Sequence, residues 1–340
     1  MTRSGAAFSR LVLRPYLGAR RAFVALCIHA PRKRAIGVAP GRTPLFRNVL
    51  FELRTRCNSR CAFCAAGVAT ETRPDVTMPF DTYARVVDDL AGLGYEGEIG
   101  FHGNNEPLMV PDLDRYVALA RERLPKSWIR IFTNGLSLSR KKGEALLAAG
   151  IDEMTVNWYA AGSGAPLPAH LIAFRDEVLP RFHPRARVRR GTGPLRPGDR
   201  SIFRFNLYRR RLDEVLDSRA GSSPNKTALP ENVGGFCDQP FSTVNITADG
   251  RVGRCCADFY FEDVMGNVPR QSLLEIWNGA PLRAAREMLL RGDRSGSALC
   301  SRCDHRGVDL GLLSPVARVA EAIVYRLDRL LLPAAPAAGA

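Results

Sequence analysis

The chain has 340 residues, of which 46% are hydrophobic, so it can bury a sizeable core, and global disorder is not expected. Its formal net charge of +15 predicts attraction to anions, such as a nucleotide-like cofactor, an acidic substrate, nucleic acid or a membrane surface. An Arg-rich proteome explains the same charge equally well. No apolar run approaches the length of a membrane span and no signal-peptide core is evident, so we expect a cytoplasmic protein.

The first half of the chain alternates between two kinds of segment. Residues 1–47 form a basic extension punctuated by Pro and Gly. After it, apolar runs predict strands over residues 45–53, 97–103, 128–135 and 152–159. Amphipathic segments between them predict helices over residues 80–94, 113–124 and 139–150. This alternation predicts βαβ units and a parallel sheet, open or closed into a barrel.

The pattern weakens after residue 160, where Pro and Gly are frequent. An Arg-rich stretch over residues 185–200 predicts a loop, and residues 201–208 predict a further strand. A second, smaller unit begins near Cys237, where residues 242–256 predict a hairpin with Asp249-Gly250 as its tight turn.

Short helices complete this unit. They are expected over residues 272–278 and 281–292. Beyond residue 310, apolar positions at helical spacing predict a tail helix that docks on the body of the protein rather than a membrane anchor.

The segment CNSRCAFC places Cys57, Cys61 and Cys64 between a predicted strand and a predicted helix. In a reducing compartment, cysteine-rich sequences favour metal binding over disulfides. Three thiolates that point at one centre suit zinc or an iron–sulfur cluster. A structural zinc site takes four ligands, and no fourth Cys or His lies nearby. The spacing therefore favours a four-iron cluster with one open iron over a zinc site or a redox-inert loop.

This C-x3-C-x2-C loop after the first strand resembles that of the radical S-adenosylmethionine (radical SAM) enzymes. The resemblance implies an α/β fold with a partial (β/α)6 barrel over residues 48–235. It also implies that the open iron of a [4Fe–4S] cluster binds S-adenosyl-L-methionine. Reductive cleavage of this cofactor would give a 5′-deoxyadenosyl radical that abstracts hydrogen from a substrate. An electron donor of the flavodoxin or ferredoxin type is the partner that such chemistry implies.

The same resemblance assigns cofactor-binding residues. Phe63 corresponds to an aromatic residue near the adenine. The segment GNNEP resembles a Gly-Gly-Glu-Pro turn, in which Gly103 permits close backbone approach and Glu106 pairs with the cofactor ammonium group. Asn104-Asn105 departs from the small residues usual there, which leaves the local backbone contacts open. Two later strand ends supply the remaining candidates, Thr133 and Asn157. A hydrogen-bonded core Asn explains Asn157 equally well.

A second group of cysteines lies in the smaller unit. Four of them can close a site completely: Cys237, Cys255, Cys300 and Cys303. Their spacing alone allows a structural zinc or an iron–sulfur cluster. Residues 236–310, however, resemble the SPASM/Twitch auxiliary domains of radical SAM enzymes. Because the cysteines suffice for one auxiliary [4Fe–4S] cluster only, the shorter Twitch form fits better.

Within this group, residues 50–303 resemble the 2-deoxy-scyllo-inosamine dehydrogenases of butirosin biosynthesis. The segment LDSRAG then places Arg219 beside the substrate, although a solvated arginine in a basic loop is the alternative. Cys256 stands where those enzymes have an aromatic residue, and it is either inert or a hydrogen-atom donor. Cys27 is expected to be a small buried hydrophobic residue.

Four functions follow from these patterns. The first is radical dehydrogenation of a hydroxylated small molecule, similar to an aminocyclitol or amino sugar of antibiotic biosynthesis. The second is epimerisation, with Cys256 returning a hydrogen atom to the opposite face. The third is modification of a ribosomal peptide, and the fourth is a zinc-containing nucleic-acid-binding protein. We expect no nucleic-acid partner, because neither zinc fingers nor an aromatic-basic surface is evident.

Overall fold

One sheet organises the protein. The computed structural model describes residues 14–38, 43–67, 71–162, 164–183, 187–189, 203–226, 235–305, 319–320, 323–324 and 326–327. The sheet has nine strands in the order β5-β6-β4-β3-β2-β1-β7-β8-β9. Every pairing from β5 to β7 is parallel, and the last two pairings are antiparallel. The strands are β1 (Asn48–Phe51), β2 (Glu98–Phe101), β3 (Trp128–Thr133), β4 (Glu153–Ala160), β5 (Arg187–Arg189), β6 (Arg204–Arg211), β7 (Thr243–Ile246), β8 (Arg251–Gly253) and β9 (Val264–Asn267).

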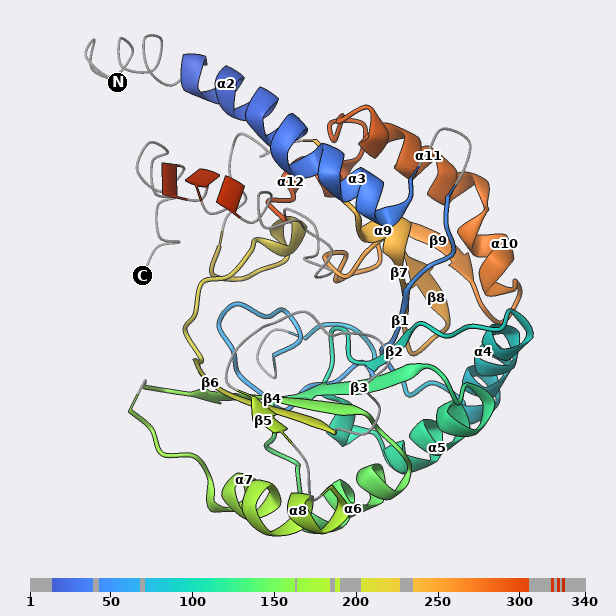
Figure 1. The fold of residues 1–340 in the computed structure, drawn as a ribbon, viewed down its shortest axis with the longest axis vertical. Coiled ribbons are helices and arrows are strands. Elements are labelled where there is room, and N and C mark those ends of the chain that lie inside the picture. The colour runs from blue at the N-terminus through green and yellow to red at the C-terminus, as the bar shows by residue number, and fades with distance from the viewer. Residues whose placement is uncertain are drawn as a thin grey trace.

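Helices cover the outer face of the parallel strands, which curve around the cysteine loop (Figure 1). The predicted helices are α4 (Phe80–Gly92), α5 (Leu113–Arg123) and α6 (Arg140–Ala148). Helix α4 buries Tyr83, Val86, Val87 and Leu90 in the main core, as its spacing predicts. Each crossover runs strand, helix, strand, so the carboxyl ends of β1 to β4 meet at one edge of the sheet.

The weak pattern after residue 160 conceals helical structure that the sequence did not predict. A continuous helical segment comprises α7 (Ala169–Ala173), the π-helix η4 (Phe174–Val178) and α8 (Leu179–Phe182). It buries Leu171, Phe174 and Val178. These buried positions keep helical spacing, but Pro168 and Pro180 at the two ends of the segment conceal the pattern in the sequence. The strand predicted over residues 201–208 is confirmed as β6, and it begins at Arg204.

The smaller unit extends the same sheet. Strand β7 pairs in parallel with β1, and the predicted hairpin to β8 turns at Gly250, whose φ is 82°. The remaining elements of this part are η5 (Arg219–Gly221), α9 (Gln239–Ser242), α10 (Leu273–Trp277), α11 (Ala280–Leu290) and α12 (Ala298–Arg302). Because β7 pairs with β1, the cysteines of the second unit have a fixed position relative to the barrel.

The basic N-terminal extension is helical where it is described. It runs through α2 (Arg14–Val24), the π-helix η2 (Ala25–His29) and α3 (Ala30–Ile36), and Figure 1 shows it as a rod above the smaller unit. Val24 and Ile28 pack against Ala320 and Val324 of the tail, which agrees with a docked tail helix. The half-buried Cys27 packs beside them. Most of the tail lies outside the described residues.

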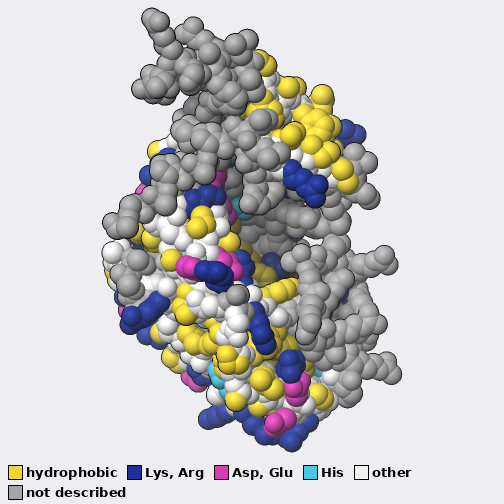
Figure 2. Space-filling view, turned by 90° about the vertical axis from the view of Figure 1, so that its left-hand side faces the viewer, with side chains coloured by type: hydrophobic (Ala, Val, Ile, Leu, Met, Phe, Trp, Pro, Cys, Tyr) yellow, Lys and Arg dark blue, Asp and Glu magenta, His cyan; other side chains and the backbone are white. Residues whose placement is uncertain are grey.

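Among the described residues there is no membrane-spanning helix, and the face shown in Figure 2 has no continuous basic stripe. No described helix combines the length and hydrophobicity that a bilayer span requires. On the face shown in Figure 2, the described Lys and Arg side chains are dispersed among apolar and acidic ones.

Candidate active site

The sequence-predicted site residues gather at the carboxyl ends of β1 to β4. The loop with Cys57, Cys61 and Cys64 follows β1, and the turn with Glu106 follows β2. Thr133 is the last residue of β3, and Asn157 lies on β4. In an open parallel sheet, this edge is where ligands bind. The fold therefore brings together residues that are up to about a hundred positions apart in the sequence.

Glu106 is held rigidly at the centre of this edge. Its side chain is 2% exposed and accepts hydrogen bonds from Leu108 N at 3.0 Å, Thr133 Oγ1 at 2.5 Å and Asn134 N at 2.7 Å. The first of these bonds caps the short helix η3 (Pro107–Met109). Burial raises the pKa of Glu106 to about 7, although the three hydrogen bonds oppose this shift. A fixed, buried carboxylate of this kind suits a cationic ligand group.

Asn134 links this turn to the cysteine loop, and sequence analysis missed it. Its Nδ2 donates to Asn58 Oδ1 at 2.8 Å and lies 3.7 Å from Cys57 Sγ. Asn58 Nδ2 in turn donates to Ser137 Oγ at 3.0 Å. Asn134 directly follows Thr133 in the segment FTNG, so the sequence contained a signal for it.

The cysteine loop itself is packed by small and aromatic side chains. Cys57 and Cys64 lie against a buried cluster formed by Ala65, Ala66 and Phe259. Cys61 is buried, and its Sγ lies 3.1 Å from Ser59 Oγ. Because Phe259 belongs to the smaller unit, that unit contacts the first cysteine loop directly.

Phe63 faces β4 from the same loop. Its ring centroid lies 5.5 Å from that of Tyr159. Since alternate residues of a strand share a face, Asn157 lies on the same side of β4 as Tyr159. This side faces the cysteine loop, which agrees with the predicted position of Asn157 near the cofactor.

The second group of cysteines comes from three separate segments. Cys255 and Cys303 pack on a cluster of Ala220, Ala257 and Leu299, whereas Cys237 and Cys300 pack on the neighbouring cluster around Phe236 and Met288. A buried arginine braces the last segment, because Arg294 Nη1 donates to the backbone oxygens of Cys303 and His305 at 3.2 and 3.1 Å. The structure thus brings the four predicted cysteines into one part of the molecule.

Arg219 lies between the two groups of cysteines. Its Nη2 donates to Cys256 O at 3.0 Å and to Asn104 Oδ1, and its Nη1 lies 4.0 Å from Cys64 Sγ. Asn104 comes from the turn that leads to Glu106, and it is 4% exposed. The predicted substrate-site arginine therefore touches both cysteine-bearing parts of the protein, and so it is not a freely solvated side chain.

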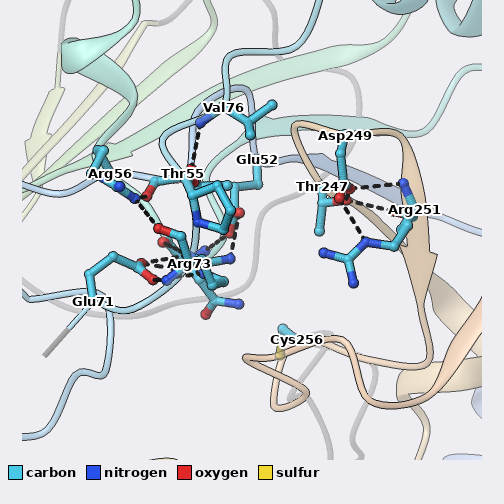
Figure 3. A network of polar contacts seen from close by, with 12 residues as sticks. Glu52, Thr55, Arg56, Glu71, Arg73, Val76, Thr247, Asp249, Arg251 and Cys256 are labelled. Carbon is cyan, nitrogen blue, oxygen red and sulfur yellow. Dashed lines mark hydrogen bonds and ion pairs between the residues drawn. The ribbon is translucent and has the colours of Figure 1, made fainter.

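A buried ionic network, which sequence analysis also missed, holds the backbone of Asn104. Figure 3 shows its charged members, Glu52, Glu71 and Arg73. Glu52, directly after β1, accepts from Arg73 Nη1 and from Asn104 N, both at 2.8 Å. Arg73 also pairs with Glu71 at 2.9 Å, and its guanidinium lies 4.3 Å from the centre of the Phe259 ring. No motif marks these residues, because their roles depend on three segments meeting.

The residues present fit iron–sulfur clusters and S-adenosyl-L-methionine. Burial raises the pKa of Cys57 to about 12 and that of Cys237 to about 12, so both thiols need a nearby cation to ionise, which a cluster supplies. Asn105, next to Glu106, has both amide atoms buried without a partner among the described residues, as expected where a polar ligand binds. Among all the residues that the structure describes, no three His, Cys, Asp or Glu side chains converge closely enough to hold a single metal ion.

Comparison with protein families settles the class. A model of the radical SAM superfamily matches residues 52–161, and a model of SPASM, an iron-sulfur cluster-binding domain, matches residues 237–304. This chain is a radical SAM enzyme. Its cofactors are therefore S-adenosyl-L-methionine and [4Fe–4S] clusters, as the resemblance of the first cysteine loop implies.

One relative of this radical SAM enzyme is similar to it over nearly the whole length of the relative. The S-adenosyl-L-methionine-dependent 2-deoxy-scyllo-inosamine dehydrogenase of Niallia circulans is 27% identical, over 78% of this chain and 95% of the relative. A crystal structure of BtrN in complex with AdoMet and 2-DOIA superposes with a TM-score of 0.62 at 25% identity. That match covers 80% of this chain and 98% of the other.

A shorter match covers only part of the chain. GTP 3′,8-cyclase 2 of Mycobacterium bovis is 33% identical over 39% of this chain and 40% of the relative. The similarity to the dehydrogenase, in contrast, spans both the barrel and the smaller unit.

Proposed function

We propose that this radical SAM enzyme dehydrogenates an alcohol carbon of a hydroxylated small molecule of the aminocyclitol or amino-sugar class. One observation carries the proposal: the similarity to 2-deoxy-scyllo-inosamine dehydrogenase covers 95% of that enzyme, including the smaller unit. The position of Arg219 between the two groups of cysteines supports it, because a guanidinium there can hydrogen-bond a substrate hydroxyl.

The ligands of both clusters follow from the loops described above. We assign Cys57, Cys61 and Cys64 to the cluster that binds S-adenosyl-L-methionine, and a second set of four cysteines to one auxiliary cluster: Cys237, Cys255, Cys300 and Cys303. Domain boundaries at residues 47, 235 and 310 fit this assignment.

Other residues would hold S-adenosyl-L-methionine. The Glu106 carboxylate is placed to accept the ammonium group, and the free amide of Asn105 lies beside it. Phe63 and Asn157 line the side of the loop that faces β4, where the adenosine would lie. Gly103 fits this site because an added Cβ would come within 3.1 Å of Glu52 Cβ.

The reaction removes two hydrogens from the substrate. When bound, S-adenosyl-L-methionine and the first cluster would supply a radical for abstraction of one hydrogen atom, and the auxiliary cluster would supply an acceptor for the remaining electron. The hydroxyl proton would be released, and a carbonyl group would form at the oxidised carbon. Arg219 would orient the hydroxyl oxygen, and the packing of Phe259 on the cysteine loop would exclude water.

Epimerisation is the second candidate, and one observation favours keeping it. Cys256 lies directly beside Arg219, since its carbonyl oxygen accepts a hydrogen bond from that guanidinium. A thiol close to the substrate can return a hydrogen atom to the opposite face of a carbon radical. Such a reaction conserves the mass of the substrate.

An anaerobic assay with 2-deoxy-scyllo-inosamine and related aminocyclitols tests the proposal. Dehydrogenation gives a product lighter by two hydrogens, and Cys256→Ala still forms it. A product of unchanged mass, with one solvent deuterium on carbon, would establish epimerisation instead. In that case Cys256→Ala would abolish the product.

We further propose an electron donor of the flavodoxin or ferredoxin type and a cytoplasmic location. Both follow from the need for a low-potential reductant and for reduced thiols. Reduction by purified flavodoxin, followed through formation of 5′-deoxyadenosine, checks the donor.

A further inference from the structure

Each group of cysteines has an arginine whose guanidinium faces one of its sulfurs. Arg219 Nη1 lies 4.0 Å from Cys64 Sγ in the first group. Arg254 Nη1 lies 3.5 Å from Cys300 Sγ in the second group. These two residues are far apart in the sequence and belong to different loops, so the similarity of their positions calls for an explanation.

The backbone at Arg219 adopts a strained conformation. Arg219 and Ala220 have φ values of 45° and 54°, and Gly221 follows with a φ of 89°. A left-handed conformation is unfavourable for a residue other than glycine. Consecutive left-handed residues persist only where the surroundings hold them, and such strain concentrates at functional sites.

Hydrogen bonds on both sides hold the Arg219 side chain in place. The Asn104 side chain accepts from the barrel side, and the Cys256 carbonyl accepts from the smaller unit. Asn104 is itself fixed through its backbone, because its N–H donates to Glu52 and its carbonyl accepts from Arg73. The guanidinium is therefore held at Cys64 by both units, and Asn104 acts as its positioning residue.

Arg254 has a different electrostatic setting. Its Nη2 pairs with Asp263 Oδ2 at 3.2 Å, so its positive charge is largely compensated. Arg219 has no carboxylate within ion-pair distance among the described residues, although its backbone N–H donates to Asp217. Of the two arginines that face a cysteine sulfur, Arg219 therefore carries the less compensated charge, and the buried Arg294 adds a further positive charge near Cys237 and Cys303 of the second group.

We propose that Arg219 and Arg254 raise the reduction potentials of the two clusters, with the larger effect at the cluster beside Cys64. Hydrogen bonds to cluster sulfurs and nearby positive charge stabilise the reduced, more negative state of a cluster. This inference rests on the proposed assignment of the cysteines, but it does not depend on the identity of the substrate.

Redox titration followed by EPR spectroscopy tests the inference on anaerobically reconstituted, full-length protein without S-adenosyl-L-methionine or substrate. Arg219→Met is expected to shift the first cluster to a more negative potential and to leave the auxiliary cluster unchanged. Arg254→Met is the matched control, and it is expected to shift only the auxiliary cluster, by a smaller amount. A variant that lacks the first three cysteines assigns the two signals.

Asn104→Ala keeps the test decisive if Arg219→Met does not load iron. It leaves Arg219 in place but removes the acceptor that aims it, so the first cluster should shift in the same direction by less. An unchanged reduction potential of the first cluster in Arg219→Met overturns the inference. If Arg219→Met does not load iron, an unchanged potential in Asn104→Ala overturns it. A wild-type protein with iron for one cluster only would instead contradict the proposed cysteine assignment.

Discussion

The two groups of cysteines are built in opposite ways. The first group occupies eight consecutive residues after β1, and it lies at the same edge of the sheet as the turn with Glu106. The second group combines a cysteine before α9, one after β8 and two around α12. A short loop can form a metal site with local geometry alone, whereas a dispersed site exists only once β7, β8 and α12 are assembled. The first group is thus suited to exchange a ligand, and the second to close around its cluster.

The largest expected effects separate the two groups. Cys61→Ala should abolish cleavage of S-adenosyl-L-methionine, because two thiolates do not hold the first cluster. Cys303→Ala should still form 5′-deoxyadenosine but should lose substrate oxidation, and each variant should lose roughly half of the iron. Iron analysis measures the cluster content of each variant, and chromatography measures the 5′-deoxyadenosine formed. Full loss of 5′-deoxyadenosine in a folded Cys303→Ala protein would contradict the division of roles.

The buried carboxylate of Glu106 distinguishes the first group further. Glu106→Gln should weaken binding of S-adenosyl-L-methionine by about 10–100-fold, because a charge-assisted hydrogen bond is lost. Since the pKa of Glu106 is raised to about 7 by burial, the wild-type affinity should rise with pH between 6 and 8. Calorimetric titration should show that the affinity of the variant for S-adenosyl-L-methionine does not change with pH. Parallel profiles for both proteins would rule out this role.

The same pKa predicts the pH dependence of stability without cofactor. The folded-state pKa of Glu106, about 7, lies above its ordinary value of 4.5, so the folded protein retains a proton that the unfolded chain has released. The stabilisation from this proton is complete below pH 4.5 and is lost as pH rises through 7. Glu106→Gln should therefore gain thermal stability relative to wild type between pH 5 and 8.

Asn134 should show a smaller effect on the first group. Asn134→Ala removes the amide that lies 3.7 Å from Cys57 Sγ, and outer-shell changes at metal ligands typically cost about 10-fold or more. The rate of cofactor cleavage under excess reductant measures the loss. Asn278→Ala, an exposed change at the end of α10, is the matched control and should leave this rate unchanged.

The smallest expected effect lies in the scaffold of the second group. Ser272 and Glu275 form a capping box at the start of α10. Ser272→Ala should reduce the free energy of unfolding by about 1 kcal/mol, whereas Ser272→Thr retains the cap. Denaturant titration resolves the two variants. A change in cofactor cleavage by either variant would show that α10 affects the first group.

The sequence alone determined the features that depend on short spacings. The Cys57–Cys64 loop, the Glu106 turn and helix α4 are each encoded within a few turns of chain, so periodicity and motif spacing suffice to predict them. The helical segment over residues 169–182 was not predicted, because Pro168 and Pro180 conceal the helical spacing of its apolar residues.

Only the tertiary structure decided how distant parts meet. The contacts of Arg219 with Asn104 and Cys256, the support from Glu52 and Arg73, and the link from Asn134 to Cys57 join segments that no local pattern connects. Hydrogen bonds between such segments depend on the order of strands in the sheet. That order places the ends of β1, β2 and β3 at one edge and joins β7 to β1.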